Sequence, residues 1–254
     1  MSVLHIENIA KSYGGVKAVR GVSFELAAGE LVALIGPNGA GKTTTFNMLN
    51  GQIAPDAGTI VLDGVDVTGI NPAALWRQGV GRTFQITATF ASMTVAENVQ
   101  TALLSRQGNF GLWGRADHIA RDEALALLDL IGMRDAADQA CGLLAYGDLK
   151  RVELAMALAN DPHLLFMDEP CAGMAPAERS VLMQLVHSLT RERGTAVLFT
   201  EHDMDMVFAY ADRILVMDRG RLIATGSPDE IKANAEVRRI YLGNRDYADL
   251  AVRP

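Results

Sequence analysis

Long apolar runs are missing from this sequence, since no stretch approaches the roughly 18 consecutive apolar residues needed to cross a bilayer. The first residues, Met1 to Glu7, also lack the basic region followed by an apolar one that marks a secretory signal. We therefore expect a soluble globular protein that would need a partner to hold it at any membrane. Hydrophobic residues make up 49% of the 254 positions, which is ample for a packed core.

Cysteine is scarce, with only Cys141 and Cys171 present. Two cysteines are too few for a disulfide framework and lack metal-site spacing, so we expect two small buried side chains in a cytosolic protein. Positive charge is in deficit too, because 23 Lys and Arg against 30 Asp and Glu give a net charge of -7. This balance argues against a general nucleic-acid binder, so no nucleic-acid partner is expected. No internal repeat or low-complexity tract is evident, which favours one domain.

The stretch Gly36-Pro-Asn-Gly-Ala-Gly-Lys-Thr43 fits the G-x-x-x-x-G-K-[ST] phosphate loop at every specified position. It follows the apolar run Glu30 to Ile35 and precedes a predicted helix that runs on to Leu49. Its glycines let successive backbone N–H groups converge on a phosphate at a helix N-terminus. Lys42 would reach the β- and γ-phosphates, and Thr43 would offer Mg²⁺ a hydroxyl ligand. The predicted nucleotide-binding residues are Gly36, Pro37, Asn38, Gly39, Ala40, Gly41, Lys42, Thr43 and Thr44.

A second motif, His163-Leu-Leu-Phe-Met-Asp168-Glu169-Pro170, is an apolar strand that ends in two adjacent carboxylates. Side chains at the carboxyl edge of a parallel sheet face the ligand crevice, and neighbouring residues project differently. Asp168 would hold Mg²⁺, and Glu169 would orient and polarise the attacking water. The alternative interpretation is a buried strand with a solvated acidic end. The phosphate loop upstream argues against this alternative.

The N-terminal part predicts strands at Val3 to Ile6, Gly21 to Leu26 and Glu30 to Ile35, and a strand pair within Thr59 to Val67. The strand pair would extend a small antiparallel layer near the N-terminus. Tyr13, just before the second strand, could stack on a nucleotide base, or it could be ordinary packing near a turn.

Helices dominate the region between the two strand-rich parts. Thr94, with Glu97 three residues on, is a capping box at a helix start. Helical spacing resumes from Asp117 to Ile131 and again from Leu149 to Ala159. We therefore expect a helical subdomain inserted at about residues 86–160.

The segment Leu143-Leu-Ala-Tyr-Gly147-Asp148 precedes the last of these helices. Its Leu-Ala-Tyr-Gly-Asp resembles the signature loop of the ATP-binding cassette (ABC) ATPases, usually Leu-Ser-Gly-Gly-Gln. Gln85 resembles the family's Q-loop glutamine, and His202, after the strand Thr195 to Thr200, resembles its switch histidine. The resemblance covers nearly the whole chain and implies ATP and Mg²⁺ as ligands. The expected catalytic residues are then Lys42, Glu169 and His202; the expected metal ligands are Thr43, Gln85 and Asp168; and Tyr13, Gln85, Ala145, Tyr146 and Gly147 join the phosphate loop at the nucleotide.

Gln85 and His202, which the resemblance adds, are weaker evidence for a nucleotide site when each is taken alone. A glutamine carbonyl after a strand can ligate Mg²⁺ or water, and so couple Gln85 to movement of the helical insertion. An isolated histidine at a strand end is usually just hydrogen-bonded structure. The phosphate loop in the same chain favours a role for His202 at the γ-phosphate.

Three positions depart from the family pattern. In that family two subunits bind head to tail, and the signature loop of one closes on the ATP of the other. Ala145 takes the place of the signature serine and removes one hydroxyl donor, although backbone N–H groups remain. Asp148 replaces glutamine, so we expect its carboxylate to point away from phosphate. Ala175 occupies the aspartate or asparagine position of the D-loop that follows the carboxylate pair, so this position offers no polar side chain for communication between the two sites.

The C-terminal part predicts an antiparallel hairpin within Asp212 to Gly226 and a helix capped by Ser227. Glu236 to Gly243 is similar to the short C-terminal segment of ATPases that serve branched-chain amino acid importers. We place the ABC domain at residues 4–243, that segment at 236–243 and a loose tail at 244–254.

These observations predict an α/β fold with a P-loop NTPase (RecA-like) core, an N-terminal antiparallel β layer and a helical subdomain. The resemblance implies an ATPase that works as a homo- or heterodimer with transmembrane permease subunits, and indirectly with a periplasmic or extracellular substrate-binding protein. It would drive uptake of branched-chain or related amino acids from the cytoplasmic face of the cell membrane. Its groove around Gln85 to Met93 would contact the permease.

Several rivals stay open. The same family includes urea and amide importers, lipopolysaccharide exporters and members that act in DNA repair or translation. The last group usually carries a long coiled-coil insertion or a second cassette, and this chain has neither. A nucleotide-binding module that has lost hydrolysis is also compatible with Ala145, Asp148 and Ala175.

Overall fold

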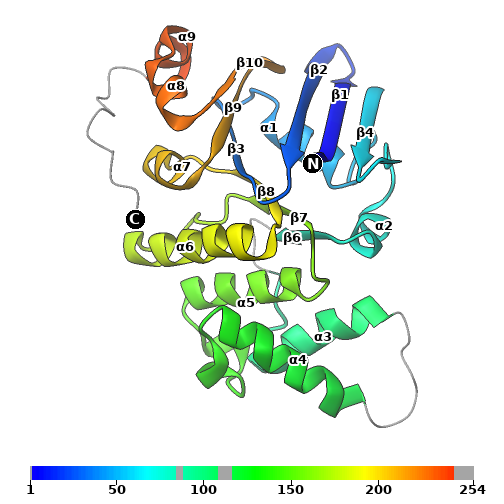
Figure 1. The fold of residues 1–254 in the computed structure, drawn as a ribbon, viewed down its shortest axis with the longest axis vertical. Coiled ribbons are helices and arrows are strands. Elements are labelled where there is room, and N and C mark those ends of the chain that lie inside the picture. Colours follow the sequence, from blue (N-terminus) through cyan, green and yellow to red (C-terminus); the bar gives the residue numbers. More distant parts are fainter. Residues whose placement is uncertain (1, 84–87, 108–115, 243–254) are drawn as a thin grey trace.

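The central β-sheet has the strand order β10-β9-β3-β8-β7-β6 in the computed structural model, which describes residues 2–83, 88–107 and 116–242 (Figure 1). Strands β6, β7, β8, β3 and β9 pair in parallel, and β10 adds an antiparallel edge. All residues of β3 and β8 are buried, which explains their continuous apolar sequences, because helices or a second sheet cover both faces of such strands. The strands are β3 (Leu31–Ile35), β6 (Val80–Thr83), β7 (Leu164–Asp168), β8 (Ala196–Thr200), β9 (Arg213–Asp218) and β10 (Arg221–Gly226).

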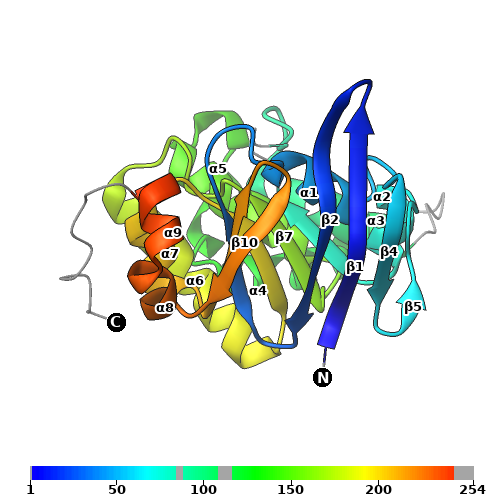
Figure 2. The ribbon, with the colours of Figure 1, turned by 90° about the horizontal axis from the view of Figure 1, so that it is seen from above.

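A second, antiparallel sheet has the order β2-β1-β4-β5 and stands beside the central sheet (Figure 2). Its strands are β1 (Ser2–Tyr13), β2 (Val16–Ala27), β4 (Ala57–Leu62) and β5 (Val65–Asp66). The structure confirms the predicted layer but corrects two strand lengths, since β1 and β2 form one long hairpin. The register shifts between Ile6 and Ile9, where Asn8 has a φ of 52°. This irregularity interrupts the polar–apolar alternation, so a period-two pattern does not reveal the full strands.

Helices α3, α4 and α5 lie together on one side of the central sheet, next to α6 (Figure 1). The predicted capping box at the start of α3 is confirmed, because Thr94 Oγ1 accepts the Glu97 N–H at 3.2 Å and Glu97 Oε2 accepts the Thr94 N–H at 2.7 Å. None of the helices in the described part of the chain has the length and apolar character to cross a bilayer. The helices are α1 (Lys42–Leu49), α2 (Pro72–Arg77), α3 (Val95–Gln107), α4 (Ala116–Leu130), α5 (Tyr146–Leu158), α6 (Pro176–Arg193), α7 (Met204–Tyr210), α8 (Pro228–Ala233) and α9 (Ala235–Val237), with short turns at Arg134–Ala136, Cys141–Leu143 and Arg238–Leu242.

Helix α5 begins at Tyr146, three residues before the predicted start at Leu149. The sequence Tyr-Gly-Asp resembles a turn, yet two features favour the helix. Asp148 lies in the first turn, where a negative charge complements the helix dipole. Gly147 packs so closely on Glu178 of α6 that a Cβ atom would come 2.7 Å from the carboxyl carbon.

Two hydrophobic cores fill the opposite faces of the central sheet. Alternate residues of β3 contribute to each, with Leu31, Ala33 and Ile35 in one and Val32 and Leu34 in the other. Both cysteines are free and buried, as predicted. In the core beneath the phosphate loop, the rings of Phe46 and Phe166 meet edge to face with centroids 5.5 Å apart.

Phe166→Ala should lower the free energy of unfolding by about 3–5 kcal/mol, because Phe166 is fully buried and its partner ring loses the edge-to-face contact. Phe90→Ala is the matched control, since that side chain is 52% exposed and the same truncation should change stability by less than about 0.5 kcal/mol. Urea unfolding followed by circular dichroism measures both. Equal losses for the two variants would contradict the described core.

Candidate active site

The phosphate loop connects β3 to α1, and its backbone requires glycine at two points. Gly41 has a φ of 101°, and a Cβ atom there would lie 2.5 Å from the carbonyl oxygen of Ala18. At Gly36, with a φ of 151°, a Cβ atom would collide with the carbonyl oxygen of Met217. Gly39 instead has no heavy atom within 4 Å of a Cβ position. The loop is therefore tightly backed on one side and open on the other, which fits a phosphate cradle.

A cavity of about 520 Å³ opens above this loop. The loop, β2, the end of β7 and the turn after β9 all contribute to it. Lys17, Arg20 and Arg219 add exposed positive groups that the sequence pattern did not identify, because only the fold brings the β1–β2 hairpin and the β9–β10 turn to this loop. The lining residues are Val16, Lys17, Ala18, Arg20, Asn38, Gly39, Ala40, Gly41, Lys42, Thr43, Thr44, Glu169, His202 and Arg219.

Lys42 holds its ammonium group against its own loop. Nζ donates hydrogen bonds to the carbonyl oxygens of Gly36 at 2.6 Å and Pro37 at 3.2 Å. Burial lowers the pKa of Lys42, and the charges of Glu169 and Asp168 partly oppose that shift. The cation thus lies at the cavity between the loop and the two carboxylates, where a polyphosphate can meet it.

The carboxyl ends of β7 and β8 meet at this cavity, with Asp168 paired opposite Thr200. Thr200 Oγ1 donates to Asp168 Oδ1 at 2.7 Å and accepts the backbone N–H of Glu169 at 3.0 Å. Sequence reasoning did not identify Thr200. In the sequence, Thr200 is distinguished only by its place at the end of a strand, about 30 residues after the carboxylate pair.

Glu169 has a left-handed backbone with a φ of 48°, which is rare for a residue with a side chain. Such a conformation costs on the order of 1–3 kcal/mol. Asn8, Asp63 and Asp161 share the positive φ away from this cavity, so the backbone of Glu169 is notable here for its place beside the phosphate loop. Its Oε1 lies 2.8 Å from Nε2 of His202. Two predicted catalytic side chains from neighbouring strands are therefore in direct contact at the cavity.

The residues fit a divalent cation of the magnesium type. Thr43 is exposed at the start of α1 and lines the cavity, and Asp168 ends β7 directly before Glu169, which also lines it, so a hydroxyl and a carboxylate stand at the same edge of the sheet. These are the hard oxygen ligands that Mg²⁺ takes when it also binds substrate phosphates. Within the described residues, no group of three or more His, Cys, Asp and Glu side chains forms a metal site alone. Gln85 lies outside the described residues.

Six predicted nucleotide-binding residues in the described part of the chain are not among those that line the cavity. Two of them, Gly36 and Pro37, begin the phosphate loop, and their carbonyl oxygens accept hydrogen bonds from Lys42. Tyr13, 51% exposed, pairs across the hairpin with Val16, which does line it. Ala145, Tyr146 and Gly147 begin α5 and contribute nothing to this cavity. Base stacking by Tyr13 and nucleotide binding by the signature loop therefore stay predictions.

The start of α5 contacts the loop that follows β7. A Cβ atom at Gly173 would lie 3.2 Å from the ring of Tyr146. Asp148 forms an ion pair with Arg151 on the same helix, and the expectation that its carboxylate turns away from phosphate stays a prediction. Ala175 precedes α6, and its N–H donates to Glu178 Oε2 at 3.0 Å.

Comparison with known proteins adds to this geometry. The sequence model of the ABC transporter family matches residues 19–172, and the one described as branched-chain amino acid ATP-binding cassette transporter matches residues 221–247. The high-affinity branched-chain amino acid transport ATP-binding protein LivG of Salmonella typhimurium is 40% identical over 95% of this chain and 98% of its own. The lipopolysaccharide export system ATP-binding protein LptB of Haemophilus influenzae is 37% identical over 96% and 99%.

Solved structures agree with the fold. The ATP-binding cassette MJ1267 in its ADP conformation has a TM-score of 0.85 and 32% identity, covering 96% of this chain and 100% of that one. The cassette MJ0796, in a dimeric post-hydrolysis state bound to ADP and Pi, has a TM-score of 0.76 and 25% identity over 89% and 98%. The predicted P-loop NTPase fold is confirmed. Sequence, fold and phosphate loop together place this chain in the ABC transporter family, as one of its nucleotide-binding ATPase subunits.

Proposed function

We propose that this chain hydrolyses Mg·ATP to drive uptake of branched-chain or related amino acids through separate transmembrane subunits. The observation that carries hydrolysis is the contact between Glu169 and His202, 2.8 Å apart at a strained backbone position beside the phosphate loop. A module that only binds nucleotide has no need for a carboxylate paired with an imidazole beside the phosphate loop.

Each residue has a distinct role in the proposed reaction. The phosphate loop and Lys42 bind and neutralise the phosphates, and Thr43, Asp168 and Gln85 would hold Mg²⁺, which supplies further charge neutralisation when bound. Glu169 orients the attacking water and accepts its proton. His202 holds Glu169 through its Nε2 contact, and it would reach the γ-phosphate of a bound nucleotide. Positioning and charge neutralisation supply most of the rate in such a reaction.

The functional unit in this proposal is a head-to-tail dimer. Ala145, Tyr146 and Gly147 lie apart from the cavity of their own chain, so they would serve the nucleotide of a second subunit. The N-terminus of α5 offers that nucleotide backbone N–H groups, which can replace the hydroxyl absent from Ala145. The dimeric state described for MJ0796 supports this arrangement.

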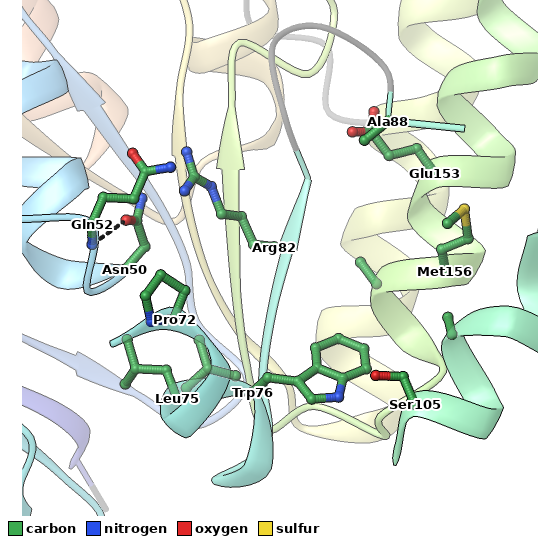
Figure 3. Close-up of a pocket in the computed structure, with 13 residues that line it drawn as sticks. Asn50, Gln52, Pro72, Leu75, Trp76, Arg82, Ala88, Ser105, Glu153 and Met156 are labelled. Carbon is green, nitrogen blue, oxygen red and sulfur yellow. Dashed lines mark hydrogen bonds between the residues drawn. The ribbon is translucent and has the colours of Figure 1, made fainter. Parts of the chain in front are cut away.

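A second cavity, of about 490 Å³, is our candidate for the contact with the permease (Figure 3). It lies between α2 and β6 on one side and α3 and α5 on the other, beside the predicted groove. Much of its lining is apolar, including Leu75, Trp76 and Met156, so a helix of the permease could bury apolar side chains here. Docking here would hold the chain at the cytoplasmic face of the membrane. The lining residues are Asn50, Gln52, Pro72, Leu75, Trp76, Val80, Arg82, Ala88, Ala102, Ser105, Glu153, Met156 and Ala157.

Two observations support an amino-acid substrate. The C-terminal match at residues 221–247 and the similarity to LivG both concern branched-chain amino acid transport. A substrate-binding protein outside the membrane would then act through the permease and not on this chain. Lipopolysaccharide export is the second candidate, favoured by the similar identity to LptB.

Uptake of labelled leucine tests the substrate. In cells of the source organism that lack this gene, uptake should fall, and the parental chain should restore it while Glu169→Gln should not. Normal uptake together with altered lipopolysaccharide at the cell surface would favour the export candidate instead.

Lys42→Ala should weaken binding of Mg·ATP roughly ten- to hundredfold, because each charge-assisted hydrogen bond to phosphate contributes about 1.5–3 kcal/mol. Fluorescence titration with a labelled ATP measures the affinity. Lys232→Ala is a matched control, since that ammonium lies 4.9 Å from the ring centroid of Phe208 and does not line the nucleotide cavity. Undiminished affinity in the Lys42 variant would remove this cavity as the nucleotide site.

Glu169→Gln should retain ATP binding and lose hydrolysis by about 10²- to 10⁴-fold, because an amide keeps the size of the side chain but cannot accept a proton from water. The closed state should then accumulate, so the variant should become dimeric on addition of Mg·ATP. Phosphate release and light scattering measure the two effects, with Glu192→Gln on α6 as control. Parental hydrolysis would exclude Glu169 as the base, and a monomer with ATP bound would exclude the dimer.

A further inference from the structure

Glu201 is a buried carboxylate, 4% exposed, between the two loops that carry the candidate catalytic pair. Its Oε1 accepts the backbone N–H of Cys171 at 3.0 Å. Its Oε2 accepts the N–H of His202 at 2.8 Å and that of Asp203 at 3.2 Å. One side chain therefore binds backbone groups of two segments that are about 30 residues apart in the sequence.

Arg179 connects the same two segments at a second point. Its Nε donates to the carbonyl oxygen of Met174 at 2.8 Å, and its Nη1 donates to Asp203 Oδ2 at 2.8 Å. The D-loop, residues 171–175, is thus connected at both ends to the loop that bears His202. A displacement of one loop that leaves the other in place would break buried hydrogen bonds.

The surroundings of Glu201 favour a rigid connection. Cys171 is 2% exposed, and burial, followed by the nearby Glu201 charge, raises the pKa of its thiol, so that this group stays protonated. Three N–H groups on one buried carboxylate form a stiff arrangement, since each would lose its acceptor if the side chain moved. The left-handed backbone of Glu169 lies two residues before the Cys171 N–H that Glu201 accepts, so this arrangement adjoins it directly.

We propose that Glu201 is a positioning residue that sets the Glu169–His202 contact and makes His202 move with the D-loop. Glu169 lies two residues before Cys171, and His202 follows Glu201 directly, so one carboxylate fixes both sides of the 2.8 Å contact. This inference rests on the proposed hydrolysis and adds a route by which a second subunit could influence it. Ala175 has no side-chain oxygen to transmit such a signal, whereas the Glu201 connection acts through the backbone.

Glu201→Gln is the test, because the amide keeps the size of the side chain but turns one acceptor oxygen into an NH₂ group that faces backbone N–H donors. We expect kcat for ATP hydrolysis to fall about ten- to hundredfold, which is the order of loss that a small misplacement of reacting groups causes. KM and the affinity for Mg·ATP should stay within about twofold, since Lys42 and the phosphate loop are untouched.

Glu230→Gln is the matched control. Glu230 Oε2 also accepts a backbone N–H, that of Ser227 at 2.7 Å, but it does so at the start of α8, and it does not line the nucleotide cavity. A general loss of stability would affect both variants, whereas a loss of kcat alone should occur only at Glu201. Thermal unfolding of each purified chain separates the two effects.

The outcomes are distinguishable. If the parental chain does not hydrolyse ATP, the proposed function fails; if it does and the Glu201 variant matches its kcat, only this inference fails. A proportional loss of kcat and ATP affinity would show a merely structural role and also overturn it. If the Gln variant does not unfold cooperatively, Glu201→Asp decides, since the shorter carboxylate should lower kcat with KM unchanged, and a parental kcat would overturn the inference.

Discussion

The pairing of β7 with β8 is the interaction on which the rest of the site depends. It places Asp168 opposite Thr200, and the threonine hydroxyl then bonds both the Asp168 carboxylate and the Glu169 backbone. Because β8 also pairs in parallel with β3, the phosphate loop that follows β3 lies at the same edge of the sheet. A slip of one residue would turn every side chain of β7 to the other face and move the carboxylates from the phosphate loop.

Local chemistry explains which features the sequence predicts. The phosphate loop, the acidic pair and the Thr94–Glu97 capping box depend on spacings within eight residues, so their pattern is visible in the chain, and the family and fold that they indicated are confirmed. Thr200 and Glu201 could not be identified in this way. Their roles arise from strand register and from contacts across about 30 residues, which no local pattern records.

The departures from the family pattern have structural explanations of different strength. Asp148 is compatible with an anion site because Arg151 neutralises it on the same helix. Gly147 is needed for close packing on Glu178 of α6. Tyr146 contacts Gly173, so the start of α5 packs against the D-loop of its own chain. Such packing joins α5 to the segment that Glu201 connects to His202. Packing contacts and hydrogen bonds therefore connect α5, through the D-loop, to the loop that bears His202. The side chain at position 175 is not needed for this connection.

The left-handed backbone at Glu169 also bears on how this protein can change over evolutionary time. Glycine or asparagine adopts that conformation at lower cost than glutamate, so the fold would gain stability from losing its proposed catalytic carboxylate. Stability and turnover thus select for different residues at this one position. A gene copy released from the need to hydrolyse ATP could therefore exchange glutamate for glycine or asparagine here and gain stability.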